Sequence, residues 1–133
     1  LNFNVNVNTH SDGLLLHGIG GHQDAAAGSD VTIITVPLLR GRLPVIRKEV
    51  TTVSTPCHTV DVVVTDRGIA INPEREDLIE AIKGKVEIVD IEELYKKAKS
   101  LVGEPKEPKF SDEIVAIVEY RDGTTLDVIR KVK

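Results

Sequence analysis

The sequence is poor in residues on which several classes of protein depend. Its 133 residues include one cysteine, no methionine, no tryptophan and only 3% aromatic side chains. The single cysteine, Cys57, excludes an intrachain disulfide framework and a zinc site built from several cysteines. The scarcity of aromatic rings disfavours proteins that stack single-stranded nucleic acid on side chains. No apolar run approaches the roughly 18 residues of a membrane helix, so no membrane span is expected.

The balance of charge narrows the choice further. The chain has 17 basic and 21 acidic side chains, for a formal net charge of −4, and its isoelectric point is near 5.6. It therefore lacks the basic surface of a nucleic-acid-binding protein. A hydrophobic fraction of 41% with 29% charged residues is typical of a globular protein, and the length suits one domain.

The start of the chain suggests its cellular setting and its extent. Nothing at the N-terminus resembles a signal peptide, so we expect a reduced, cytoplasmic protein. The chain has no initiator methionine and opens within an alternating pattern at Leu1-Asn2-Phe3. We therefore expect a processed product or a piece of a longer protein.

Hydrophobic periodicity predicts strands mixed with helices. Helices are expected directly after the glycines at 18–21, from Asn72 as N-cap to about Ile82, and over 90–102. An Asp122-Gly123 turn predicts a terminal hairpin of strands 114–120 and 125–132. Other strands are expected at 2–8, 14–16, 31–36, 45–53, 60–65, 69–71 and 86–89. This order predicts an α/β fold, a mixed sheet with flanking helices.

Residues 2–8 carry an unusual row of asparagines. Apolar and asparagine residues alternate strictly, which predicts a half-buried strand with its amides on one face. Asparagine is a poor strand former, so the row needs an explanation. It is interpreted as a solvated face or sheet edge, or as amides lining a polar cleft.

The densest group of candidate functional residues is Gly20-Gly21-His22-Gln23-Asp24. Glycines let a ligand approach the backbone and leave N–H groups free to donate. A helix starting nearby favours an anion or a developing oxyanion, and His22 could donate a hydrogen bond or transfer a proton. The alternative is a simple glycine turn with Asp24 as a helix cap. A metal site formed by His17, His22 and Asp24 is disfavoured, because this spacing does not ensure convergent ligands.

Two arginine-containing segments are candidates for binding an anionic substrate. Arg40-Gly41-Arg42 offers two guanidinium forks that match carboxylates or phosphates, unless it is a solvated basic turn. Asp66-Arg67 ends the apolar run 60–65, where α/β sheets tend to bind ligands, unless the two form an internal pair. Cys57 is interpreted as a small loop side chain and not as a nucleophile.

An ordered set of segments resembles a known family. Gly21-His22-Gln23-Asp24 is similar to the glycine-His-x-Asp motif of coenzyme A transferases, and the wider set resembles citrate lyase alpha subunits. The similar segments cover nearly the whole chain: Gly20 to Gly28, Thr32 to Ile34, Pro37 to Arg42, Val50 to Val53, Thr55-Pro56, Val60 to Pro73, Val118 to Gly123 and Asp127-Val128.

The resemblance implies a fold and an activity. The fold is expected to be CoA-transferase-like, with residues 1–133 forming the C-terminal portion of such a domain. The implied reaction is acyl exchange, in which citrate displaces acetate from the thioester of an acyl carrier protein. With the reasoning above, the expected catalytic residues are Gly20, Gly21, His22 and Asp24. The expected substrate-binding residues are Arg40, Arg42, Asp66 and Arg67.

The resemblance also implies partners. The thioester sits on a CoA-derived prosthetic group of the acyl carrier (gamma) subunit, and a separate beta subunit cleaves the citryl thioester. The N-terminal part of the same subunit is expected to complete the site in an oligomer, and no metal is expected in this chain.

Two departures from the family pattern keep other functions open. Cys57 follows Thr55-Pro56 where relatives usually have glycine, and the chain lacks the Glu-Asn-Gly motif of many CoA transferases. The alternatives are a non-catalytic assembly or docking fragment of the same complex, and a transferase for a related acid such as citramalate. A sugar-phosphate isomerase is a third, although no acid and base set supports it.

Overall fold

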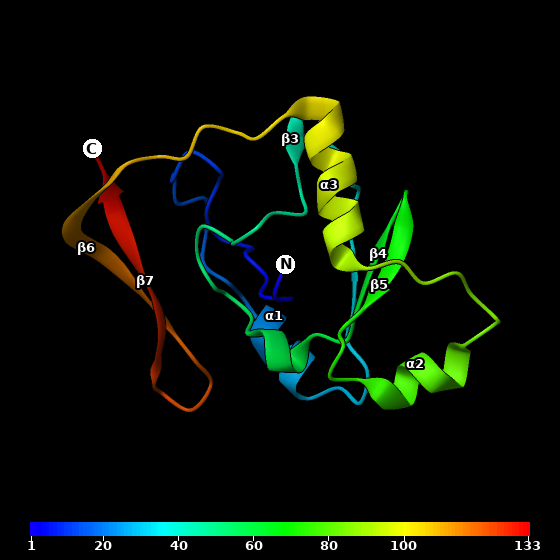
Figure 1. The fold of residues 1–133 in the computed structure, drawn as a ribbon. Helices are drawn as coiled ribbons and strands as arrows, with labels where there is room; N and C mark the ends of the chain where they lie inside the picture. Colours follow the sequence, from blue (N-terminus) through cyan, green and yellow to red (C-terminus); the bar gives the residue numbers. More distant parts are fainter.

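The computed structural model describes all residues from Leu1 to Lys133 and has a mixed α/β fold (Figure 1). A three-stranded sheet has the order β1-β4-β5, and two further pairs of strands, β2-β3 and β6-β7, form separate hairpins. Figure 1 shows the β6-β7 hairpin on the opposite side from the three-stranded sheet. The elements are α1 (His22–Ala27), β1 (Ile33–Thr35), β2 (Leu39–Arg40), β3 (Leu43–Pro44), a 3-10 turn (Cys57–Thr59), β4 (Val62–Thr65), β5 (Gly68–Ile71), α2 (Glu76–Ile82), α3 (Ile91–Val102), β6 (Phe110–Glu119) and β7 (Thr125–Val132).

The central strand of the sheet is β4, as the apolar run 60–65 predicts. It pairs in parallel with β1 and antiparallel with β5, so that Val63 lies opposite Ile34 on one side and Ala70 on the other. Val62 and Val63 are buried, which explains why the run is not alternating. The strand predicted at 31–36 is present as the shorter β1, whereas the burial that its β-branched residues suggest is wrong: β1 forms one edge of the sheet, and Ile33 is 55% exposed.

Helix α3 forms where the hydrophobic periodicity of residues 90–102 predicts a helix, with its apolar residues in one stripe. The Asp90 side chain accepts a hydrogen bond of 2.8 Å from the Glu92 N–H group, which caps an otherwise unpaired donor. Leu94 and Ala98, which belong to the apolar stripe, are buried. Gly103 ends the helix with a positive φ of 75°. The helix therefore covers the core with one face and exposes the other.

The core joins helix, sheet and loop residues. Phe3, Leu38 and Ile46 lie in loops, so long connecting segments contribute as much as the regular elements. The buried cluster comprises Phe3, Leu38, Ile46, Val60, Val63, Ala70, Leu94 and Ala98. Only 23 of 133 residues are buried, which makes this a small core for the chain length.

The predicted strand at 2–8 is wrong. Phe3 has a left-handed φ of 62°, which breaks the alternation, and Val5 makes only an isolated bridge to Thr55. The asparagine side chains bond to the chain itself: Asn4 accepts from the Cys57 N–H group, and Asn8 accepts from the Ser54 hydroxyl. The row is thus neither a solvated face nor a cleft lining, because its amides replace the backbone ladder of a strand.

Three other predicted strands are also absent. Residues 45–53 form a loop, residues 14–16 only a bridge from Leu15 to Thr9, and residues 86–89 only a bridge from Ile88 to Ile69. Side chains again take the backbone donors, since the Val53 N–H group donates to the Asp127 carboxylate at 2.7 Å. A short local apolar run does not form a strand where no neighbouring strand is free to pair with it.

The start of α2 is later than predicted. The helix begins at Glu76 and ends at Ile82, where the sequence places its end. Asn72 does not cap it; its side-chain N–H groups donate to the Val60 and Cys57 carbonyl oxygens, at 2.9 and 3.2 Å. Asn72 therefore fastens the end of β5 to the segment before β4.

The terminal hairpin is confirmed and is longer than predicted, since β6 begins at Phe110. Val118 and Ile129 are buried, whereas Ile114 and Ile117 expose 51% and 62% of their surface. None of the helices is long and apolar enough to cross a membrane.

Candidate functional site

The glycine loop before α1 is open to a ligand. Gly20 has a left-handed φ of 59°, and a Cβ atom added at Gly20 or Gly21 would meet no atom within 4 Å. The N–H groups of Gly20, Gly21 and His22 donate to no acceptor in the protein. With six residues, α1 adds little dipole, so these open donors provide most of the attraction for a carbonyl oxygen or an anion.

His22 is held in a fixed orientation beside this loop. Its Nδ1 atom lies 2.7 Å from the hydroxyl oxygen of Thr55. Thr55 is fully buried, and its backbone pairs with Val5 through hydrogen bonds of 2.9 and 3.0 Å. The second ring nitrogen, Nε2, has no protein partner and is available to a ligand.

Asp24 and Gln23 have different environments on α1. Asp24 is exposed, lies 3.9 Å from the Arg121 guanidinium, and caps no N–H group, so its interpretation as a helix cap is wrong. Gln23 is buried and donates to the Glu119 carbonyl oxygen at 2.8 Å, while its own amide oxygen has no partner. Gln23 thus fastens α1 to the end of β6. Thr55 does not belong to the predicted site, because only the folded chain brings it to His22. Gln23 lies within the predicted group, but the sequence assigns it no role.

Arg40 and Arg42 lie on the short β2-β3 hairpin. Gly41 at its turn has a left-handed φ of 62°, and both arginines are exposed without a hydrogen bond or an ion pair. Their guanidinium donors are therefore free for a ligand. Figure 1 shows β3 near the top of the view and α1 well below it, so the hairpin that carries the arginines lies apart from the helix that follows the glycine loop.

Asp66 and Arg67 form the turn between β4 and β5. The Asp66 carboxylate accepts a hydrogen bond of 2.7 Å from the Leu38 N–H group and lies 3.1 Å from the Arg67 guanidinium. The Leu38 N–H group, more than Arg67, holds the pKa of Asp66 below its ordinary value. The internal pair is thus present here, next to the segment that leads into β2. The predicted site residues fall into two groups: the glycine loop, and an arginine end formed by Arg40, Arg42, Asp66 and Arg67.

The geometry gives little support to a metal site at His17, His22 and Asp24 or to a role for Cys57. His17 turns back on the Gly18 carbonyl oxygen at 2.6 Å, and His17, His22 and Asp24 do not gather into a metal-binding cluster. Cys57 is half-buried, and its N–H group donates to Asn4.

Fold and site together define a mixed α/β domain that presents an open glycine-histidine loop. The family model for the alpha subunit of citrate lyase (CitF) matches residues 1–132. The chain belongs to this family, as the resemblance of its segments predicts.

Individual relatives agree with this assignment. The citrate lyase alpha chain of Klebsiella pneumoniae is 52% identical over 134 residues, which cover 100% of this chain and 26% of the relative. The citrate lyase alpha chain of Escherichia coli K12 is 48% identical over 132 residues, again 26% of its length. A crystal structure described as the alpha subunit of citrate lyase from Streptococcus mutans in complex with citrate superposes with a TM-score of 0.95. It is 51% identical, and the match covers 99% of this chain and 26% of that one. The chain thus spans about a quarter of the length of these relatives.

Proposed function

We propose that the subunit containing this chain performs acyl exchange, in which citrate replaces acetate on the thioester of an acyl carrier protein. The observation that carries the proposal is the open glycine pair beside a fixed histidine. The membership of the citrate lyase alpha subunit family supports it. The structural relative that contains citrate supports the choice of acid.

The residues of the loop suit the charge that acyl exchange develops. When a carboxylate and a thioester react, negative charge builds on a carbonyl oxygen, and donors fixed in advance stabilise it. The N–H groups of Gly20, Gly21 and His22 provide such donors, and His22 adds its Nε2 atom. Asp24 holds the positive side chain of Arg121 near the loop.

A thioester arm fits this loop. A CoA-derived prosthetic group supplies an acyl carbon that is activated toward a carboxylate. Because neither Gly20 nor Gly21 has an atom within 4 Å of its missing Cβ position, a narrow arm can lie directly on the backbone. We propose that the group belongs to the acyl carrier (gamma) subunit, that a beta subunit then cleaves the product, and that the assembly is a cytoplasmic oligomer.

The arginine end is proposed to bind the spare carboxylates of citrate. Arg40 and Arg42 have free guanidinium forks, and Arg67 lies beside Asp66 on the neighbouring turn. Since this end lies away from the glycine loop, one citrate contacts both only if another part of the subunit, or a second copy, brings them together. The N-terminal part of the same subunit is the proposed contributor.

Labelled citrate tests the proposal in the complete subunit. With an acetylated carrier protein, label should move into the protein-bound thioester while acetate is released. His22→Ala should reduce this exchange at least about a hundredfold, the range of a lost oxyanion donor. His10→Ala is the matched control, because His10 lies on an exposed turn beside Asp12 and should leave exchange unchanged. Label that stays in free citrate with the unaltered subunit contradicts the proposal.

A docking role without catalysis is the second candidate. The small core and the exposed apolar residues of β6 favour it, because they leave surface for other protein. In that case His22→Ala leaves exchange intact, whereas changes on β6 impair assembly of the complex. Replacing citrate with citramalate in the same assay decides between the two acids.

A further inference from the structure

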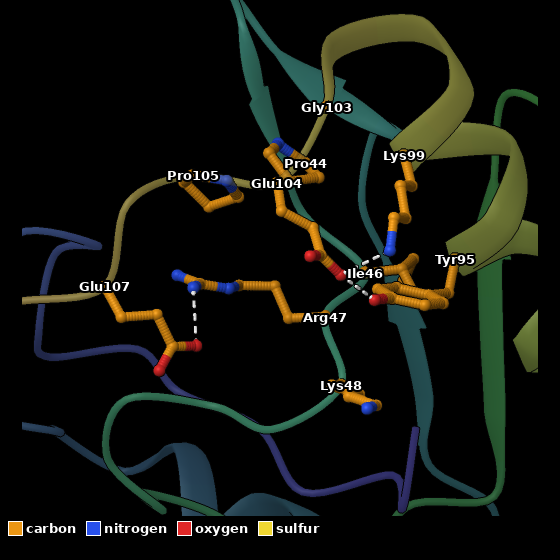
Figure 2. A pocket seen from close by; sticks show the side chains of 10 residues that line it. All are labelled: Pro44, Ile46, Arg47, Lys48, Tyr95, Lys99, Gly103, Glu104, Pro105 and Glu107. Carbon is orange, nitrogen blue, oxygen red and sulfur yellow. Dashed lines mark hydrogen bonds and ion pairs between the residues drawn. The ribbon is translucent and has the colours of Figure 1, made fainter.

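A pocket outside the predicted site lies between the C-terminal end of α3 and residues 44–48. Its volume is about 210 Å³, below the roughly 300–1,000 Å³ of sites for drug-sized ligands, so it suits a small molecule. Figure 2 shows Arg47 extending across it between two glutamates. The lining includes Pro44, Ile46, Arg47, Tyr95, Glu104 and Glu107.

Few of the hydrogen-bond donors of the Arg47 side chain are used within the protein. Its side chain is only 15% exposed, yet its guanidinium makes no hydrogen bond in the protein. Its one ionic contact is to Glu107 at 3.5 Å, and the Glu107 side chain is 82% exposed. A guanidinium has five N–H donors, and one contact of 3.5 Å to an exposed carboxylate leaves most of them free to bond a ligand in the pocket.

The other charges of the pocket do not supply the missing acceptors. Glu104 accepts hydrogen bonds from Tyr95 and from Lys99, and the Tyr95 hydroxyl is the main cause that lowers the pKa of Glu104. Lys48 is exposed and has no ion pair. Arg47 and Lys48 are therefore the cations left without firm partners, and Ile46 and Tyr95 give an apolar wall beside them.

We infer that this pocket binds a small organic carboxylate, which pairs with the Arg47 guanidinium in place of Glu107. A planar guanidinium matches the two oxygens of a carboxylate, and the apolar wall suits a short carbon chain. Glu107 occupies the position that the ligand takes and competes with it. None of the residues proposed for acyl exchange lines the pocket, although Pro44 lies on the β2-β3 hairpin that carries Arg40 and Arg42. The inference is therefore tested by a readout that does not measure exchange.

Chemical protection of Arg47 tests this inference in the complete subunit. Phenylglyoxal modifies accessible arginines, and mass spectrometry of peptides measures the rate at each one. Saturating succinate should slow modification of Arg47 at least about fivefold and leave Arg130 unchanged. Arg130 is exposed on β7 and serves as the internal control.

Two matched variants test the competition with Glu107. Glu107→Gln should lower the succinate concentration that gives half-protection by about two- to fivefold, the range of an exposed ion pair. Glu113→Gln removes the same charge from a glutamate that pairs with Lys131, outside the pocket, and should not change it. This difference separates loss of a competitor from a general change in net charge.

The alternatives give different results. An Arg47 that does not react without succinate, or that reacts equally with and without it, overturns the inference. Equal effects of the two glutamine variants overturn the competition. If inorganic phosphate protects Arg47 at lower concentrations than succinate, the ligand is not a carboxylate.

Discussion

Gly18 and Gly21 have equally open surroundings. A comparison of valine substitutions at the two positions therefore tests whether a side chain blocks exchange only at Gly21. A side chain at either meets no atom within 4 Å, and neither requires a positive φ. Both should accept valine without loss of folding. Gly21→Val should abolish acyl exchange by the complete subunit, because its side chain fills the face where a thioester approaches. The measurement is the exchange rate together with circular dichroism.

Gly18→Val is the control for this prediction. It should keep most of the activity, since Gly18 precedes the open N–H donors of Gly20 and Gly21. If a folded Gly21→Val subunit retains exchange, the glycine loop takes no part in the mechanism.

Arg40 and Arg42 allow a test of the arginine end at single residues. Lysine keeps the charge but cannot make the bidentate fork. Arg40→Lys or Arg42→Lys should raise the apparent KM for citrate by a factor corresponding to about 1.5–3 kcal/mol, with little change in the KM for the carrier. Arg130→Lys provides the control, because Arg130 is an exposed residue of β7. Unchanged kinetics in both variants mean that the hairpin is a solvated basic turn.

The start of α2 is held by a cluster of one arginine and two carboxylates. Arg75 contacts Asp61 at 2.6 Å and Asp77 at 2.8 Å, and it joins the helix to the segment before β4. Its guanidinium lowers the pKa of Asp77 from 3.8 to about 2. A carboxyl whose pKa falls on folding stabilises the protein above its unfolded pKa and loses this effect as it is protonated.

The pH dependence of stability tests this cluster. Asp77→Asn should lower the Tm near neutral pH, and its difference from the parent should shrink as the pH falls below about 3.8 and vanish below about 2. Glu80→Gln, an exposed pair with Lys83 on the same helix, should change the Tm little at any pH. A constant difference between Asp77→Asn and the parent at all pH values contradicts the assignment.

The sequence predicts the elements whose signals are local. The α3 helix carries its own cap and apolar stripe, and the β6-β7 hairpin carries its own turn. The β4 strand is apolar on both faces because it is central. The strand predictions for 2–8 and 45–53 are wrong because side chains distant in the sequence bond to these segments. The Ser54 hydroxyl donates to the Asn8 side chain, and the Asp127 carboxylate accepts from the Val53 N–H group. No local period encodes those partners.

The candidate site is predictable only in part for the same reason. The glycine loop and His22 stand next to one another in the sequence, and so does Arg40-Gly41-Arg42. Thr55, which orients His22, lies 33 positions away. The separation of the arginine end from the loop, and the pocket at Arg47, depend on how α3 and the β2-β3 hairpin pack, which spacing along the chain does not indicate.

The molecule as a whole exposes much apolar surface for its size. Large side chains project from β6 and from the segment before the glycine loop, and Leu14, Leu16, Ile114 and Ile117 are each more than half exposed. Exposed large apolar side chains in such number are typical of a surface that contacts other protein. Relatives contain about four times the length of this chain, so they have further protein available to cover it.

These features predict that the 133-residue chain folds alone but does not catalyse exchange. Folding is expected because α3, β4 and the β6-β7 hairpin agree with their local signals, and because α3 and β4 share one core. Inactivity is expected because the glycine loop and the arginine end lie apart, and a site between them needs groups from both sides.

The chain should show a cooperative thermal transition and bind a hydrophobic dye in its native state. Adding the remainder of the subunit should restore exchange and reduce dye binding together. Exchange by the chain alone would mean that the glycine loop is sufficient and that the arginine end is not part of the site.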